Sequence, residues 1–303
     1  MVTKIAITGA SGYVGHAVLD ALWDSNAEST AIVRKPCVLR ASKVLVGSLD
    51  CERVQKAIRS ADVVIHLAGA CRPKPSETYY GTNVASAAAV AQASLDSNVK
   101  RIVMLSVLGA DECSSNEYLN TKAKAERVLL GTRIPTVVFR SSHIIGDPEH
   151  PGMFAESLLS RDGEPVKIPG NGKQLISPVS LGDAAQAIAR AVESKRTGIY
   201  ELSGPDQLSI DDLARLLNGN EDVPLNHLPS RLAMYLSRVI PGTPSGWIEV
   251  VTRPSVGNPT RAARDFGLTF RSLGSLWHDT QRSSTLRTGW QLNTCESSIS
   301  ASA

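Results

Sequence analysis

The sequence predicts an α/β fold with a doubly wound parallel sheet, because short apolar segments alternate with segments of helical spacing through its first half. The segments expected as strands are residues 4–8, 30–33, 43–46, 63–67, 101–105 and 136–139. Helix-like segments lie between them, including residues 13–23, 51–59 and 82–97. Strands joined through helices pair in parallel, so we expect one sheet with helices on both faces.

A glycine-rich turn links the first expected strand to the first expected helix. It reads GASGYVG from residue 9 to residue 15. Its glycines allow a tight turn, a close approach of the backbone to phosphate, and close packing of helix against strand. The helix N-terminus then offers amide donors to a pyrophosphate. This is the pattern of a Rossmann dinucleotide-binding domain, so Gly9, Gly12, Tyr13 and Gly15 are expected to bind the cofactor.

The end of the second expected strand indicates which dinucleotide is bound. In this fold, an acidic residue there binds the ribose 2′-hydroxyl of NAD, whereas an arginine accommodates the 2′-phosphate of NADP. The strand is followed by Arg34 and Lys35, with no acid at that point. Two cations match a phosphate dianion, so NADP is favoured, with NAD as the other option. The alternative is that both residues are a solvated strand end.

A tyrosine and a lysine four residues apart suggest acid–base chemistry. Tyr118 and Lys122 open a strongly helix-forming segment, residues 122–130, and positions four apart share one helix face. A neighbouring ammonium favours the phenolate and brings the pKa of a tyrosine down towards neutrality. The pair also follows the strand at 101–105, whose carboxyl end faces the ligand crevice of such a sheet.

Together these motifs resemble the short-chain dehydrogenase/reductase superfamily, in its extended and atypical members related to NAD-dependent epimerases and dehydratases and to the NDUFA-type accessory subunits of complex I. The resemblance covers about residues 3 to 217. The matching features are the glycine turn, the run His66-Leu67-Ala68-Gly69, Asn83, Ser106, Tyr118 with Lys122, and the runs at 139–146, 168–174 and 178–185.

The resemblance implies roles for several of these residues. Tyr118 would be the acid–base group, and Lys122 would lower its pKa and hold the nicotinamide ribose. Leu67, Ala68 and Gly69 would line the cofactor. Ser106 would bind the substrate oxygen, although the family often carries this hydroxyl one position later, where this chain has Val107. The alternative for Ser106 is a strand-end serine bonded to the backbone. Asn83 could equally brace its own helix.

The organisation of the chain changes after Gly146, where proline and glycine become frequent. We therefore expect a cofactor-binding core at residues 1–146. Residues 147–282 are expected to form a mixed region that completes the sheet and covers the substrate site. Within it, 183–193 and 209–217 are predicted as helices and 198–202 as a strand. The Ser- and Thr-rich residues 283–303 are predicted to be disordered.

Composition excludes several classes of protein. The 32 basic and 29 acidic residues leave a net charge of +3, too little for a nucleic-acid partner. Five scattered cysteines and six histidines show no metal-ligand spacing, so no metal is expected and a reducing cytoplasm fits best. No apolar run reaches membrane-spanning length, and the first strand begins too early for a signal peptide. A homodimer is one option for the assembly.

The expected function is hydride transfer between NADP, or NAD, and a small carbonyl or hydroxyl compound, with Tyr118 and Lys122 as the catalytic pair and Ser106 as a third member. A nucleotide-sugar epimerase or dehydratase is the alternative enzyme. A non-catalytic NADPH-binding accessory or assembly protein is the alternative outside enzymes. Intact Tyr118 and Lys122 favour catalysis, because a protein that only binds the cofactor has no chemical need of both.

Overall fold

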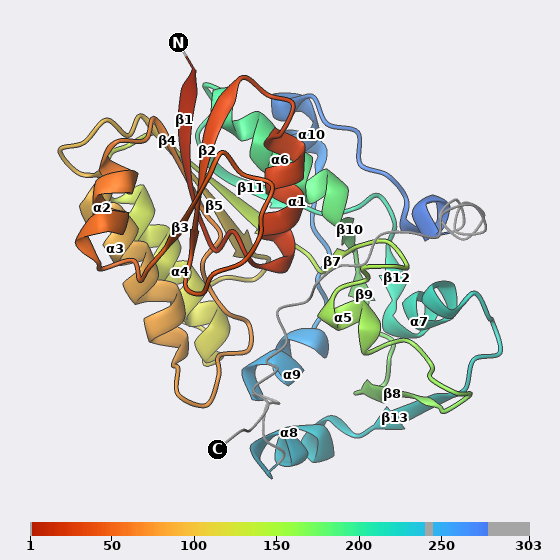
Figure 1. The fold of residues 1–303 in the computed structure, drawn as a ribbon. Coiled ribbons are helices and arrows are strands. Elements are labelled where there is room, and N and C mark those ends of the chain that lie inside the picture. The colour runs from red at the N-terminus through yellow and green to blue at the C-terminus, as the bar shows by residue number, and fades with distance from the viewer. Residues whose placement is uncertain (1, 240–244, 278–303) are drawn as a thin grey trace, which may run out of the picture.

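The computed structural model describes residues 2–239 and 245–277. Within them, a seven-stranded sheet in the order β3-β2-β1-β4-β5-β6-β11 forms the main body (Figure 1). All neighbouring strands in it are parallel. The strands are β1 (Thr3–Thr8), β2 (Ala27–Val33), β3 (Lys43–Val46), β4 (Val63–His66), β5 (Arg101–Val107), β6 (Thr136–Ser141) and β11 (Gly198–Leu202). The predicted doubly wound α/β fold is confirmed.

Helices cover both faces of this sheet (Figure 1). One face packs against α1 (Tyr13–Leu22), α6 (Leu181–Glu193) and α10 (Thr260–Phe266). The other packs against α2 (Glu52–Arg59), α3 (Ser86–Ser94) and α4 (Glu117–Leu130), with a π-helical turn, η1 (Tyr80–Ala85), before α3. Side chains alternate between the two cores along each strand: Ile5 and Ile7 face α1, and Ala6 faces the opposite side.

The order of the strands reverses between β1 and β4. The chain builds β1, β2 and β3 outward in one direction, and then returns to place β4 beside β1 and continue the other way. Loops leaving these two central strands therefore diverge at their carboxyl ends. Ligands of open α/β sheets bind in the crevice that this divergence creates.

A second region, whose elements alternate along the chain with α6, β11 and α10 of the main body, has its own apolar core. Figure 1 shows its elements gathered at one side of the main sheet. Its small sheets pair β7 with β10, β9 with β12, and β8 with β13. The elements are β7 (Ile144–Ile145), α5 (Met153–Glu156), β8 (Val166–Pro169), β9 (Leu175–Ile176), β10 (Val179–Ser180), β12 (Leu208–Ser209), α7 (Ile210–Asn218), β13 (Leu225–Leu228), α8 (Ser230–Val239) and α9 (Ser245–Val251). No helix among the described residues is long and apolar enough to span a bilayer.

Predicted boundaries shift where capping or helix type was not foreseen. The helix expected at 122–130 begins at Glu117, because the side chain of Asn116 caps it. The helix expected at 82–97 is instead η1 followed by α3, which ends at Ser94. Ser209 caps α7 as predicted, accepting a hydrogen bond from the backbone nitrogen of Asp212. The tail predicted to be disordered, residues 283–303, lies outside the described residues.

Candidate active site

The glycine turn lies where β1 and β4 separate. Gly9 has a φ of +72°, in the left-handed region that favours glycine. A Cβ at Gly9 would lie 2.6 Å from the backbone nitrogen of Ala68 and 2.8 Å from the carbonyl oxygen of Leu67. A Cβ at Gly15 would lie 2.5 Å from the carbonyl oxygen of Ala10. These glycines allow the turn, the loop after β4 and α1 to pack closer than side chains would permit.

The first turn of α1 is suited to an anion. Gly12 occupies the N-cap and supplies no side-chain cap, and the first turn contains no acidic residue. By contrast, the side chains of Asn116, Ser180 and Ser209 cap α4, α6 and α7. Uncapped amides at the positive end of a helix dipole match the pyrophosphate of a dinucleotide. The residues present at this turn therefore fit the expected cofactor.

Tyr13 connects α1 to the second region. Its hydroxyl donates a hydrogen bond of 3.0 Å to the carbonyl oxygen of His150. A Cβ at Gly152 would lie 2.7 Å from the Cζ atom of the Tyr13 ring. Burial raises the pKa of Tyr13, and the nearby charge of Asp147 raises it further. The structure thus assigns Tyr13 a bridging contact, and its expected contact with the cofactor stays a prediction.

Arg34 and Lys35 lie exposed directly after β2, at the position predicted from the sequence. The side chain of Arg34 is 71% exposed, and its Nη1 donates a hydrogen bond to Oε1 of Glu77. Glu77 belongs to residues 70–79, the later part of the segment between β4 and η1, which we call the β4 strap. The end of β2 therefore carries a carboxylate after all, supplied by a segment more than forty residues away in sequence.

The loop at Leu67, Ala68 and Gly69 is held in place by Asn83. The Oδ1 atom of Asn83 accepts a hydrogen bond of 3.1 Å from the backbone nitrogen of Ala70. Its Nδ2 donates one of 3.1 Å to the hydroxyl of Thr121 on α4. Asn83 therefore braces the loop against α4. The alternative that the sequence left open was similar, with Asn83 bracing its own helix.

Tyr118 and Lys122 both lie on α4, four residues apart, so they share one helix face. Lys122 is only 8% exposed, and its ammonium donates a 2.7 Å hydrogen bond to the carbonyl oxygen of Leu105 near the end of β5. Burial lowers the pKa of Lys122 to about 8. The helix and the strand end together fix this ammonium at the carboxyl edge of the sheet.

The surroundings of Tyr118 differ from those expected. Its ring lies 5.8 Å, centroid to centroid, from that of Tyr79, whose hydroxyl donates to the carbonyl oxygen of Cys71 at 2.9 Å. Burial raises the pKa of Tyr118, and Cys71 and Tyr79 raise it further. The sequence predicted that Lys122 lowers this pKa; in the structure, desolvation of the phenol raises it, and Lys122 is not among the groups that shift it. The phenol is therefore protonated at neutral pH.

Ser106 does not join this pair. Its buried hydroxyl donates a hydrogen bond to Glu126 on α4, and Arg140 binds the same carboxylate, with Nη2 2.7 Å from Oε2. This contact is not the backbone bond that the sequence offered as the alternative, and the expected catalytic role of Ser106 stays a prediction. Ser106 belongs to a buried network that joins β5, β6 and α4, and the next position, where the family often has a hydroxyl, is Val107.

The β4 strap contributes site residues that the sequence interpretation missed. Cys71 and Tyr79 lie beside Tyr118, and Glu77 lies beside Arg34. The segment has no periodic pattern, so its contacts could not be derived from spacing. Its one available signal was its position directly after β4, at the strand end that faces the crevice.

The second region closes over this end of the site through α9. Nδ2 of Asn116 donates hydrogen bonds of 2.9 Å to the carbonyl oxygen of Gly246 and to Oε2 of Glu249. A Cβ at Gly246 would lie 3.1 Å from the hydroxyl of Tyr79. Residues of α9 thus contact both the start of α4 and the β4 strap.

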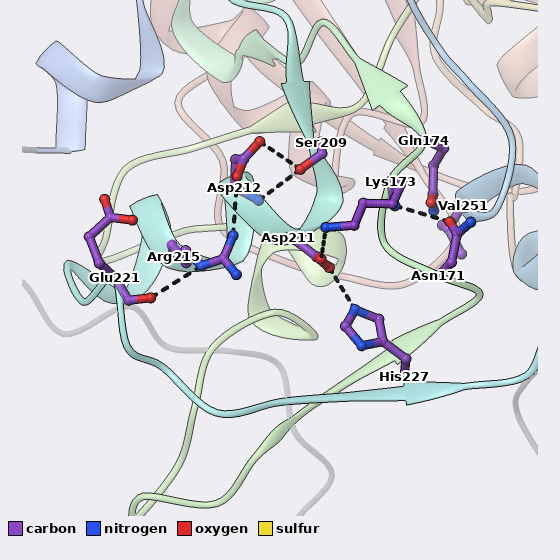
Figure 2. Close-up of polar contacts among 10 residues, drawn as sticks. All are labelled: Asn171, Lys173, Gln174, Ser209, Asp211, Asp212, Arg215, Glu221, His227 and Val251. Atoms are coloured by element: carbon purple, nitrogen blue, oxygen red, sulfur yellow. Dashed lines mark hydrogen bonds and ion pairs between the residues drawn. The ribbon is translucent and has the colours of Figure 1, made fainter.

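The second region also contains a cavity of about 440 Å³, bordered by the 170–174 loop, by residues 227–230 at the end of β13 and the start of α8, and by Thr252 directly after α9. Figure 2 shows His227 and Lys173 directed at the buried carboxylate of Asp211 on α7. Nε2 of His227 lies 2.8 Å from Oδ1, and Nζ of Lys173 lies 3.3 Å from Oδ2. The lining residues are Gly170, Asn171, Gln174, His227, Pro229, Ser230 and Thr252.

Comparisons with known proteins agree with this architecture. Ceramide reductase from Caulobacter vibrioides is 27% identical over 207 residues, which are 66% of this chain and 64% of that protein. The 40 kDa subunit of mitochondrial NADH-ubiquinone oxidoreductase from Neurospora crassa is 25% identical over 171 residues, 55% of this chain and 44% of that protein. This chain therefore spans less than two thirds of the length of either relative.

Among solved structures, UDP-glucuronic acid 4-epimerase from Bacillus cereus in complex with UDP-glucuronic acid and NAD has the same fold. Its TM-score is 0.71 at 20% identity, over 90% of this chain and 96% of that one. The model of the NAD dependent epimerase/dehydratase family matches residues 5–202. Since that match covers more than half of the chain and runs from the third residue of β1 to the last residue of β11, the chain belongs to the NAD dependent epimerase/dehydratase family.

Proposed function

We propose that the protein is an NAD(P)-dependent oxidoreductase of the short-chain dehydrogenase/reductase type, acting on a small carbonyl or hydroxyl compound. The observation that carries the proposal is the pair on α4. Tyr118 and Lys122 share a helix face, and the buried ammonium of Lys122 is fixed at the carboxyl end of β5. The similarity to a reductase from Caulobacter vibrioides supports the same reaction class.

The residues around the glycine turn would hold the cofactor. The first-turn amides of α1 would bind its pyrophosphate, the loop at 67–69 would line it, and Lys122 would bind the nicotinamide ribose. Arg34 and Lys35 would face the adenosine ribose, and these two cations support NADP as the preferred form, with NAD second. Bound there, the nicotinamide supplies or accepts the hydride.

Tyr118 would be the group that exchanges a proton with the substrate. In the direction of reduction, its phenol gives a proton to the carbonyl oxygen while the carbonyl carbon gains the hydride. The raised pKa of Tyr118 keeps that proton available at neutral pH. The phenolate that remains lies on the same helix face as the ammonium of Lys122, whose pKa of about 8 keeps it mostly charged at pH 7. Lys122 therefore stabilises the charge that Tyr118 acquires.

The UDP-glucuronic acid bound by the Bacillus cereus 4-epimerase of the same fold supports a small-molecule substrate. The cysteine pattern of the chain supports a cytoplasmic compartment, and a homodimer is the assembly we would test first.

The test is a thermal-shift titration of the cofactor-stripped protein with NADPH, NADP, NADH and NAD, followed by a screen of carbonyl substrates. A ligand that binds only the folded state raises its apparent melting temperature. We expect stabilisation by NADP(H) above NAD(H), and carbonyl-dependent oxidation of NADPH. Stabilisation by none of the four would contradict the proposal.

A non-catalytic cofactor-binding protein is the second candidate, and one observation favours it. The hydroxyl of Ser106 is hydrogen-bonded to Glu126, and the next residue is Val107. Neither position at the strand end therefore presents a free hydroxyl. Cofactor binding without turnover on any carbonyl, alcohol or nucleotide sugar would support this candidate. A response to NAD(H) alone, with turnover of a nucleotide sugar, would support an epimerase or dehydratase instead.

A further inference from the structure

The β4 strap lies across the carboxyl edge of the sheet and contacts residues assigned to both ends of the cofactor. Near one end, Tyr79 lies against Tyr118 and bonds back to Cys71. Towards the other, Glu77 binds Arg34 at the end of β2. The strap therefore brings an acidic side chain to the point where this fold places the adenosine ribose.

The carboxylate of Glu77 is held from two directions. Besides the bond from Arg34, its Oε2 lies 3.4 Å from the backbone nitrogen of Lys74. The backbone nitrogen of Glu77 donates to the carbonyl oxygen of Lys74 at 2.8 Å, which closes the turn that presents the side chain. Glu77 is 21% exposed, compared with 71% for Arg34. Its pKa is lowered, mainly by the hydrogen bond from Arg34, so it is ionised at neutral pH.

A carboxylate at this point discriminates between the two dinucleotides. The 2′-phosphate of NADP would have to compete with Glu77 for the donors of Arg34 and would lie close to a like charge. The 2′-hydroxyl of NAD is a hydrogen-bond donor, and a carboxylate is an acceptor for it. Arg34 and Lys35 therefore favour binding of the 2′-phosphate of NADP, and Glu77 disfavours it.

We propose that Glu77 is a specificity-determining residue for the cofactor, which reduces the preference for NADP that Arg34 and Lys35 create. The proposal rests on the proposed function in requiring a dinucleotide at the glycine turn with its adenosine ribose beside Arg34. It makes the choice between NADP and NAD depend on a contact between the β4 strap and the end of β2.

The experiment is calorimetric titration of the full cofactor-stripped chain with NADPH and NADH, for the native protein and for Glu77→Gln. We expect Glu77→Gln to bind NADPH about threefold to tenfold more tightly, because one negative charge near the phosphate is removed. NADH should bind no more tightly than before. The gain for NADPH should shrink when Arg34→Gln is combined with Glu77→Gln, because the freed donors are then absent.

Glu112→Gln is the matched control, because it makes the same change in net charge at another ion pair, 3.1 Å from Arg127. It should leave the ratio of the two affinities unchanged. Glu77→Asp keeps the charge and tests the site if Glu77→Gln fails to fold; it should retain the native ratio within about twofold. If Glu77→Gln binds both cofactors with an unchanged ratio of NADPH to NADH affinity, the proposed role of Glu77 is wrong, and the proposed function is unaffected. Failure of the native protein to bind either cofactor would instead overturn the proposed function.

Discussion

The two ends of the candidate site are built in different ways. At one end, Tyr118 and Lys122 are carried by a capped helix, and Lys122 is buried against β5. At the other, Arg34 is exposed at the end of β2, and its partner Glu77 comes from the β4 strap. Regular structure and burial fix the first pair, whereas a loop contact on the surface decides the charge at the second. Substitutions at the first end should change the chemistry, and those at the second the choice of ligand.

The largest effect is expected at Tyr118. Tyr118→Phe removes the proposed proton donor and should reduce turnover by about 10³-fold, while NADPH still binds. Steady-state rates together with a thermal shift would separate the two effects. Tyr80→Phe, at a tyrosine that is 60% exposed, is the matched control and should keep full activity. Turnover retained in Tyr118→Phe would exclude Tyr118 as the acid–base group.

The second-largest effect is expected at Lys122. Lys122→Ala removes the ammonium and should reduce turnover by about 10²-fold. The same group predicts a pH dependence. Lys122 carries its charge below its pKa of about 8 and loses it above, so the rate of reduction should fall as the pH rises through about 8. Lys122→Arg keeps the charge at alkaline pH and should abolish that inflection, even if its rate is lower. An identical inflection in Lys122→Arg would assign it to another group.

A smaller and selective effect is expected at the other end of the candidate site. Arg34→Glu should weaken NADPH by at least about tenfold, because it replaces an attraction for the 2′-phosphate with a repulsion, and NADH should change far less. Parallel titrations with both cofactors measure this. Arg40→Glu, at another exposed arginine, is the control for net charge. Equal losses for NADPH and NADH would remove Arg34 from the cofactor site.

The smallest effect on turnover is expected at Ser106. Ser106→Ala should destabilise the fold by about 1–2 kcal/mol, because it leaves the buried carboxylate of Glu126 short of one hydrogen bond. Turnover should stay within about threefold of the native value. Urea unfolding and steady-state kinetics on the same samples test this, with the exposed Ser60→Ala as the reference. If Ser106→Ala lost most of its turnover at native stability, Ser106 would be a catalytic residue.

The difference between the two ends also explains what the sequence could predict. The strands, the glycine turn and the shared helix face of Tyr118 and Lys122 depend on periodicity and short spacings, and the structure places each on the kind of element predicted for it. The side-chain partner of Ser106 lies twenty residues away, and that of Arg34 lies forty-three away, so neither contact leaves a local pattern. The pKa of Tyr118 depends on how deeply tertiary packing buries it, which a motif does not encode.

The packing of the glycine turn constrains its three glycines to different degrees. Gly9 and Gly15 have backbone atoms of neighbouring segments where a Cβ would lie, whereas a Cβ at Gly12 would come no closer than 3.2 Å to the carbonyl oxygen of Gly9. A Cβ at Gly12 would still be tight, but it would meet a single carbonyl oxygen and is less obstructed than one at Gly9 or Gly15. The first and third glycines are thus required by the packing of the turn itself, whether or not a ligand is bound.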